Sequence, residues 1–357
     1  MLEVNNCFQC GQCTGLCPKR RVSKYSPRQR INEFLLEERD EASLECLTCG
    51  LCSQHCPQTV DYLSFVRDVR TRNFNEEAVA HKSVFTLLCE ITNSYPKANG
   101  VPSNFGGKND ANSEIAYFPG CVDFFDCFLD VGVNFHEIGE SSVNLLNRIG
   151  IKPRLLSLRC CGHDALWQGH KKIFGELRRY NTDRIKQSGV KLLVTSCAEC
   201  FRTFSKDYEL DCDVMHLSQI LERNKDRLNL QTRNQQVTYH DPCRLGRHMG
   251  VYDAPRNVLR TVKGLTLKEL DETREDSQCC GVSAWISCNT EAKALMAGKL
   301  NSAIRTGAGS IITTCPKCYA HLNCLKNEKP PIKNYNIEVA DFAIFLSRLD
   351  GEVRKET

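Results

Sequence analysis

The tripeptide Cys160-Cys161-Gly162 recurs as Cys279-Cys280-Gly281, and this repetition decides the fold. Each copy is preceded by an apolar stretch that ends in a proline and a cysteine, and is followed by a second apolar stretch that ends in C-x-x-C. The single cysteine and the cysteine pair are separated by 38 residues in the first copy and by 35 in the second. The pair and the C-x-x-C are separated by 35 residues in the first copy and by 34 in the second. Agreement at three points predicts an internal duplication.

The duplicated segments alternate between strand-like and helix-like patterns. Strand-like stretches run into the cysteines at residues 115–121, 191–196, 237–243 and 310–314. Between them, apolar residues recur at helical spacing, as do Leu166, Ile173, Phe174, Leu177 and Ile185 in the first copy. The alternation predicts two duplicated α/β modules with mostly parallel sheets, related by a pseudo-two-fold axis. Each C-x-x-C is expected where a strand ends and a helix begins, the edge at which ligands of open α/β sheets gather.

Eight further cysteines precede the duplication and form two runs of the pattern C-x2-C-x2-C-x3-C-P. The runs are Cys7, Cys10, Cys13 and Cys17 with Pro18, and Cys46, Cys49, Cys52 and Cys56 with Pro57. This is the spacing of two-cluster ferredoxins, in which the fourth cysteine of each run binds the other cluster. We therefore assign to one [4Fe–4S] cubane Cys7, Cys10, Cys13 and Cys56, and to the second Cys46, Cys49, Cys52 and Cys17. The alternative is a pair of zinc sites, which usually use two C-x2–4-C pairs held well apart.

Helical patterns surround these two runs. Ser26-Pro27 is typical of a helix start, and Ile31, Phe34 and Leu35 then share one face. A second helix is expected over Tyr62–Arg72. We predict an α+β multidomain chain, with an α-helical ferredoxin-type domain over residues 1–91, a linker over 92–113, a first module over 114–235 and a second over 236–350.

Composition excludes several classes of protein. The chain has 357 residues, 23 cysteines and a net charge of +4, which is too mild to indicate a nucleic-acid partner. Neither a secretion signal nor an apolar run long enough for a membrane span is evident, so the cysteines are expected to be metal ligands and not disulfides. We expect a cytoplasmic protein whose contact with a membrane, if it has one, is made through a partner.

Each module offers five cysteines, one more than a cubane needs. Adjacent thiolates, as in Cys160-Cys161, reach one iron only with backbone strain, although they can reach two irons or bridge them. A cluster other than an ordinary cubane is therefore favoured. The alternatives are a cubane with one spare thiol and a redox-active disulfide between the adjacent cysteines. Five cysteines outside these patterns are interpreted as buried bystanders or spare thiols, namely Cys89, Cys127, Cys212, Cys288 and Cys324.

Two C…CCG…C-x-x-C modules behind a two-cluster helical domain resemble the heterodisulfide reductase family, in the layout of a fusion of its C and B components. The stretch at residues 240–256, His-Asp-Pro-Cys-Arg-Leu-Gly-Arg-His-Met-Gly-Val-Tyr-Asp-Ala-Pro-Arg, is especially similar. The resemblance implies a non-cubane [4Fe–4S] cluster in each module and cleavage of a disulfide between the two. The implied catalytic ligands are Cys121, Cys160, Cys161, Cys197 and Cys200 in the first module, and Cys243, Cys279, Cys280, Cys315 and Cys318 in the second.

The implied substrate is the coenzyme M–coenzyme B heterodisulfide of methane-metabolising archaea or a similar disulfide. Electrons would come through the two cubane clusters from a partner in a larger complex. That partner would be either a flavoprotein with a hydrogenase or formate dehydrogenase, or a b-type membrane cytochrome. The competing function is an electron-transfer protein that links a glycerol-3-phosphate, glycolate or lactate type of flavoprotein dehydrogenase to a quinone or membrane cytochrome. A redox sensor is disfavoured, because a sensor needs one cluster and not four.

Several charged residues near the expected ligands are candidates for contact with the clusters or with an anionic substrate. They are Arg244, Arg247, His248 and Lys317, with His163 as a candidate proton relay. The segment after the second pair, Val282-Ser283-Ala284-Trp285, is bulkier than the glycine-rich run of related chains, which puts the substrate of that site in question.

Overall fold

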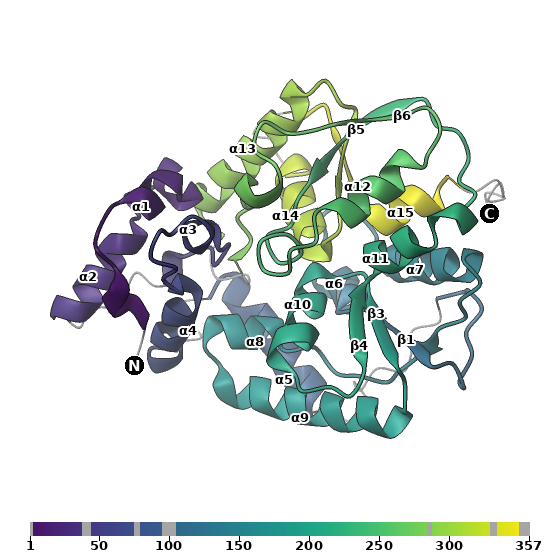
Figure 1. The fold of residues 1–357 in the computed structure, drawn as a ribbon, viewed down its shortest axis with the longest axis horizontal. Coiled ribbons are helices and arrows are strands. Elements are labelled where there is room, and N and C mark those ends of the chain that lie inside the picture. The colour runs from purple at the N-terminus through teal and green to yellow at the C-terminus, as the bar shows by residue number, and fades with distance from the viewer. Residues whose placement is uncertain are drawn as a thin grey trace.

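The computed structural model describes residues 3–37, 44–74, 79–94, 105–283, 288–328 and 334–349. Two α/β modules lie side by side, and a smaller helical domain lies at one end of the pair, at the left of Figure 1. Residues 95–104 of the predicted linker fall outside the described residues, as do Ala284 and Trp285 of the bulky segment after the second CCG.

The helical domain is built from short helices around the first eight cysteines. Its elements are η1 (Glu3–Asn6), α1 (Gln12–Leu16), η2 (Pro18–Arg21), α2 (Pro27–Glu37), α3 (Leu51–Gln54) and α4 (Tyr62–Arg72). The helix starts predicted at Pro27 and Tyr62 are confirmed, and the backbone N–H of Gln29 donates to Ser26 Oγ at 3.4 Å. Two further elements, η5 (His81–Ser83) and α5 (Val84–Ser94), connect this domain to the modules.

The first module contains a parallel sheet in the order β2-β1-β3-β4. Its strands are β1 (Ile115–Phe118), β2 (Arg154–Leu155), β3 (Leu192–Thr195) and β4 (Asp213–His216). Its helical elements are α6 (Val122–Phe128), α7 (His136–Arg148), α8 (His163–Gln168), α9 (Lys171–Ser188), α10 (Ala198–Asp207), α11 (Leu217–Arg223) and η7 (Lys225–Arg227). The first C-x-x-C therefore joins the end of β3 to the start of α10, as predicted.

The second module repeats this arrangement with the sheet order β6-β5-β7-β8, again parallel. Its strands are β5 (Gln235–His240), β6 (Leu265–Lys268), β7 (Ser310–Thr313) and β8 (Glu338–Asp341). Its helical elements are α12 (Asp253–Arg260), η8 (Arg274–Asp276), α13 (Thr290–Arg305), α14 (Pro316–Lys326) and α15 (Phe342–Ser347). Corresponding strands occupy corresponding places in the two sheets, which confirms the predicted α/β duplication.

The two modules pack through equivalent helices, as a pseudo-two-fold axis requires. Helix α7 of the first module contacts α15 of the second, and α12 of the second contacts α11 of the first. In each module a tyrosine hydroxyl also lies 2.8 Å from the hydroxyl oxygen of the residue before the C-x-x-C. The pairs are Tyr117 with Ser196 and Tyr239 with Thr314.

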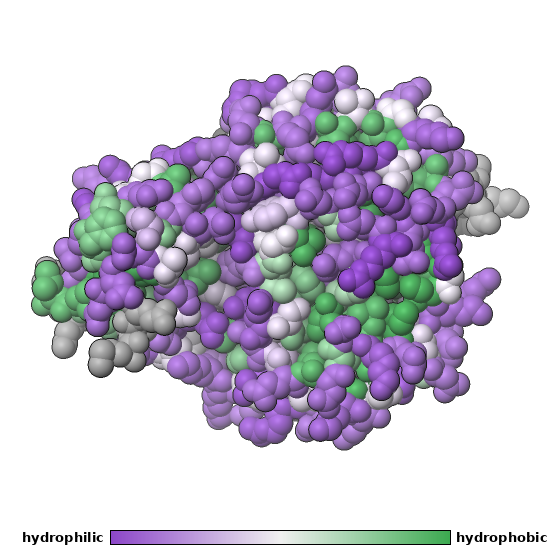
Figure 2. Space-filling view, in the orientation of Figure 1, coloured by the Kyte–Doolittle hydropathy of each residue, from purple (hydrophilic) through white to green (hydrophobic). Residues whose placement is uncertain are grey.

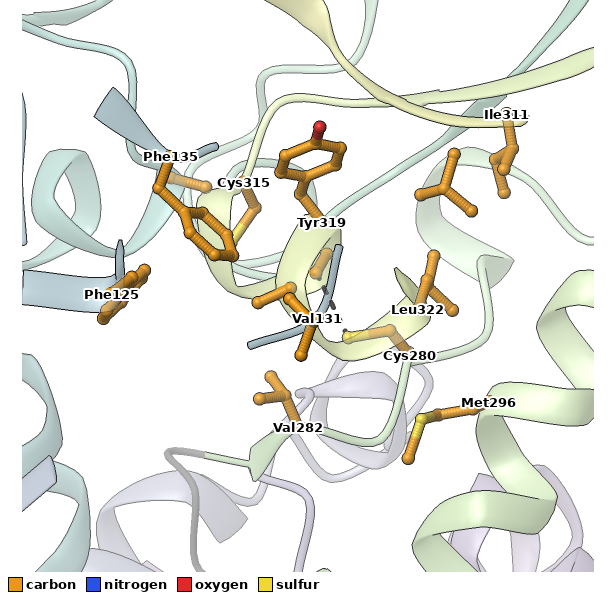
Figure 3. Close-up of a cluster of buried hydrophobic side chains, with 14 of the residues drawn as sticks. Phe125, Val131, Phe135, Cys280, Val282, Met296, Ile311, Cys315, Tyr319 and Leu322 are labelled. Carbon is orange, nitrogen blue, oxygen red and sulfur yellow. Dashed lines mark hydrogen bonds between the residues drawn. The ribbon is translucent and has the colours of Figure 1, made fainter. Parts of the chain in front are cut away.

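Apolar side chains of both modules meet in shared cores. In the core of Figure 3, Phe125 and Phe135 of the first module lie beside Cys315 and Tyr319 of the second. The rings of Phe135 and Tyr319 are 5.8 Å apart and meet edge to face. Three of the second module's cysteines, Cys280, Cys315 and Cys318, thus lie in an apolar environment that the first module helps to form.

The outer surface is mostly hydrophilic, with apolar side chains exposed at the left end in Figure 2, where α2 lies in Figure 1. The exposed large apolar residues of the helical domain are Phe8, Leu35 and Leu36, the last of them 78% exposed. In the part of the chain that the structure describes, no helix is both long enough and apolar enough to cross a membrane.

Gly169 tests how tightly the helical domain packs against the first module. It ends α8 with a φ of +101°, and a Cβ there would overlap the backbone carbonyl of Arg70 in α4. Gly189 ends α9 with a φ of +67° and has open space around it. We expect Gly189→Ala to lower the free energy of unfolding by about 1 kcal/mol through backbone strain alone. Gly169→Ala should lower it by roughly 1–3 kcal/mol more because of the overlap. Thermal unfolding of both variants measures the difference, and equal losses would contradict the close packing of α8 against α4.

Candidate metal centres

The eight N-terminal cysteines lie on two similar turns that face one another. Gly11 and Gly50 adopt left-handed conformations, with φ of 84° and 78°, immediately before α1 and α3. These two helices carry Cys13 and Cys52 and contact each other. Because glycine has no side chain, the backbone can turn sharply at each of these two positions without a steric penalty.

The thiols of this domain interact across the two runs. Burial raises the pKa of Cys17 to about 12, and the nearby thiols of Cys49 and Cys46 add to the rise. Burial likewise raises the pKa of Cys13, with Cys7 and Cys10 adding to the rise. Cys17 therefore lies near Cys46 and Cys49 of the second run. The full ligand assignment, including Cys56, stays a prediction.

In the first module, five cysteine sulfurs form a connected series. Cys121 Sγ lies 3.5 Å from Cys160 Sγ, Cys160 contacts the adjacent Cys161, and Cys161 contacts Cys200, which contacts Cys197. The cysteines come from three places in the sequence, after the ends of β1 and β3 and at the turn before α8. The sulfurs thus gather at the carboxyl edge of the sheet.

The second module repeats the same series of contacts among its own five cysteines. Cys243 contacts Cys279, Cys279 contacts Cys280, Cys280 Sγ lies 3.2 Å from Cys318 Sγ, and Cys318 contacts Cys315. The backbone N–H of the glycine after each pair donates to the first sulfur of that pair, at 3.4 Å in both modules.

These sulfur sets fit an iron–sulfur group by their chemistry. All 23 cysteines of the chain are outside disulfides, and among the ten of the two sulfur series only Cys121 and Cys243 are not buried. Contact with Cys160, and then burial, raises the pKa of Cys121, and contact with Cys280 does the same for Cys318. Thiolates so close together need positive charge to compensate their repulsion, and bound iron would supply it.

A sixth sulfur lies beside the first set. Cys89, on α5, is fully buried, and its Sγ is 3.8 Å from that of Cys160. From the sequence we interpret Cys89 as a bystander, because it precedes the duplicated segment and belongs to no spaced motif. Only the packing of α5 against α8 and α9 brings it to the site.

A buried charge network joins the two modules between their sulfur sets. Lys317, inside the second C-x-x-C, pairs with Asp164 and lies 2.6 Å from Glu199 Oε2, inside the first C-x-x-C. Glu199 Oε1 lies 3.3 Å from His163 Nε2, and Arg244 Nε donates to the same histidine nitrogen at 3.2 Å. All five side chains are buried, so the pairs are hardly screened by water.

The protonation states within this network follow from burial and from Lys317. Burial lowers the pKa of His163 to about 3, so the imidazole is neutral at pH 7. Burial alone would raise the pKa of Glu199, but the nearby charges of Lys317 and Arg244 outweigh it and lower that pKa. Burial raises the pKa of Asp164 to about 7 in spite of the ammonium beside it. The surrounding cations thus favour ionisation of Glu199, whereas burial opposes ionisation of Asp164.

Arg244 and His248 attach the helical domain to the second module. Arg244 donates to the carbonyl and hydroxyl oxygens of Thr48, and its guanidinium lies 4.1 Å from the centre of the Trp167 ring. His248 Nε2 lies 3.1 Å from the Thr48 carbonyl oxygen. The role predicted for both residues, contact with a cluster or substrate, stays a prediction. Their contacts with Thr48 are with the loop between Cys46 and Cys49.

Arg247 and Ser283 hold the same loop. Arg247 Nε donates to the carbonyl of Cys49 at 2.8 Å, and Ser283 Oγ donates to the carbonyl of Cys46 at 2.8 Å. The loop also joins an apolar cluster with the second module, whose members are Leu47, Cys49, Leu51, Cys279 and Leu295, with Cys243 packed against it. The second cysteine run of the helical domain is therefore directly adjacent to the sulfur set of the second module.

Comparison with protein families agrees with this division of the chain. A cysteine-rich domain, CCG, matches residues 115–205 and 237–323, and a 4Fe-4S dicluster domain matches residues 6–60. The CCG match appears once for each module, and the dicluster match covers the helical domain's cysteines.

Curated relatives cover most of the chain. The D component of a dihydromethanophenazine:CoB–CoM heterodisulfide reductase from Methanosarcina mazei is 28% identical, covering 90% of this chain and 89% of that protein. The B component of a fumarate reductase (CoM/CoB) from Methanothermobacter marburgensis is 26% identical, covering 90% and 68%. An EtfAB:quinone oxidoreductase from Syntrophomonas wolfei is 23% identical, covering 89% of this chain but 54% of that protein.

A similar fold occurs among solved structures. A crystal structure of a hypothetical protein from Helicobacter pylori superposes with a TM-score of 0.58 over 92% of this chain and 67% of that one, at 13% identity. This likeness concerns the fold alone.

Lys317→Met should destabilise the protein strongly, because it leaves Glu199 and Asp164 buried without their cation. We expect a loss of about 3–5 kcal/mol. Lys293→Met is the matched control, since Lys293 pairs with Glu328 near the surface and should lose no more than about 1 kcal/mol. Unfolding in denaturant measures both. Adding Glu199→Gln to Lys317→Met should recover part of the loss, and similar stability of the two lysine variants would show that the network contributes little.

Proposed function

We propose that this chain reduces a disulfide between its two modules. It is an iron–sulfur oxidoreductase component with two CCG cysteine-rich domains behind a 4Fe-4S dicluster domain, and it is homologous to the D component of heterodisulfide reductase. The observation that carries this proposal is the repeated series of five sulfurs, present in both modules. Two equivalent metal groups in adjoining modules suit a reaction in which two sulfur atoms must separate.

The reaction converts R–S–S–R′, two electrons and two protons into two thiols. Iron–sulfur groups, when bound, would supply the electrons one at a time. The ligands we assign to the two non-cubane [4Fe–4S] groups are the ten cysteines of the two sulfur series, and the eight N-terminal cysteines would hold two cubanes.

Electrons would enter through the helical domain. Its outer end carries exposed Cys10 and the exposed apolar side chains Phe8, Leu35 and Leu36, which suit a protein partner. Its inner loop packs on Cys279 of the second module. We propose the order first cubane, second cubane, second module, first module. The donor would be a flavoprotein with a hydrogenase or formate dehydrogenase, or a b-type cytochrome.

The second candidate is an electron-transfer protein that binds no disulfide. The similarity to an EtfAB:quinone oxidoreductase favours this function, because the match covers 89% of this chain. In this function the chain would pass electrons between a flavoprotein and a quinone.

Iron content tests the cofactor part of the proposal. Four four-iron groups require roughly 16 iron atoms per chain, and the dicluster domain alone requires about 8. We expect anaerobically prepared protein to contain the larger number. A value near 8 iron atoms per chain in a fully folded preparation would show that the two modules hold no iron–sulfur groups, and it would contradict the proposed chemistry.

Disulfide cleavage by the reduced protein tests the function itself. Cys161→Ser and Cys280→Ser should each lower cleavage by on the order of 100-fold, because each removes a central sulfur of one series. The cubane signals of the helical domain should remain. Cys127→Ser is the control, since Cys127 is exposed on α6 and outside both series. If wild-type protein cleaves no disulfide but reduces a quinone, the electron-transfer function replaces the one proposed.

A further inference from the structure

His240 is a polar residue at the second sulfur set that none of the ligand motifs includes. It is the last residue of β5, three positions before Cys243, and is 1% exposed. A ring nitrogen of His240 and the sulfurs of Cys280 and Cys318 all lie within 4.8 Å of one another. Imidazole nitrogen and thiolate sulfur are donors that iron and zinc bind in proteins.

Neither ring nitrogen of His240 has a hydrogen-bond partner among the described residues. Burying a polar group without a partner is unfavourable, so its retention in a core calls for an explanation. The side chain also helps to line a pocket whose other walls include Cys243, Cys279, Cys280, Cys315 and Cys318. The histidine therefore faces the same space as the sulfurs.

The first module offers an internal comparison. Phe118 occupies the position equivalent to His240, three residues before Cys121 at the end of β1. Its ring packs edge to face on Phe204, with 5.3 Å between the centroids. The fold thus accepts an apolar aromatic ring at this position, and the histidine of the second module is not required by the architecture.

We propose that His240 is a nitrogen ligand of the iron–sulfur group in the second module. This inference rests on the proposed function, since it requires such a group at the second sulfur set. The site then offers five thiolates and one neutral nitrogen, whereas the equivalent position of the first module offers no ligand atom. The nitrogen adds a donor atom to one group without adding charge, so the two groups differ in their ligand sets. The two modules are then electronically different, although their sulfur series match.

His240→Phe tests the assignment, because it installs the residue of the first module. The protein is prepared anaerobically with histidine labelled with nitrogen-15, and pulsed electron paramagnetic resonance of the reduced form detects nitrogen bonded to a paramagnetic group. We expect wild-type protein to show this coupling, and His240→Phe to lose it and to shift the potential of one module group while leaving the other unchanged. His321→Gln is the control, since His321 is buried on α14 three residues after Cys318 and should leave the coupling in place.

Iron content separates failure of the inference from failure of the proposed function. Wild-type protein with roughly 16 iron atoms per chain and no nitrogen coupling, or coupling that survives in His240→Phe, would overturn the ligand assignment and leave the function standing. Wild-type protein without iron in the second module would overturn both. If His240→Phe does not fold, His240→Asn replaces it, because a shorter amide withdraws the ring nitrogen and keeps a polar side chain at the position.

Discussion

The ion pair between Lys317 and Glu199 is the contact on which the arrangement of the two sulfur sets depends. Each side chain lies inside a C-x-x-C, between two cysteines of its own module, so the pair brings the two turns face to face. Both groups are buried, and a buried pair is favourable only when its partners are held closely and its other hydrogen-bonding sites are satisfied. Asp164 and His163 provide those further contacts, so the two C-x-x-C turns are held close to each other.

Equivalent folds surround sites that are not equivalent. The sulfur series repeats, yet the first module adds Cys89 from α5, and the second adds His240 from its own strand. The loop between Cys46 and Cys49 packs on the second module's sulfur set through Arg247, Ser283 and apolar contacts. A duplicated framework thus gives the two sites different neighbours, which suits a path that enters at one site and ends at the other.

The features that follow from local pattern and spacing could be predicted from the sequence. The strand–cysteine–helix alternation indicates the two parallel sheets, and Ser26-Pro27 indicates the start of α2. The contact of Arg244 with Thr48 could not be predicted, because 196 positions separate the two residues and only the packing of domains brings them together. Cys89 and His240 could not be predicted as members of a site either. Cys89 lies outside the repeated segments and reaches the sulfur set only through helix packing. His240 lies within the repeated strand, but the first copy has Phe118 at the equivalent position.

The stacking of Arg244 on Trp167, together with its hydrogen bonds to Thr48, ties three distant parts of the chain to one guanidinium. The helical domain leaves the ribosome before the second module, because it precedes that module in the chain. Arg244, which anchors the helical domain, is translated 196 positions after Thr48, and Arg247 and Ser283 follow it. During synthesis, the loop between Cys46 and Cys49 therefore lacks these contacts until the second module has been made.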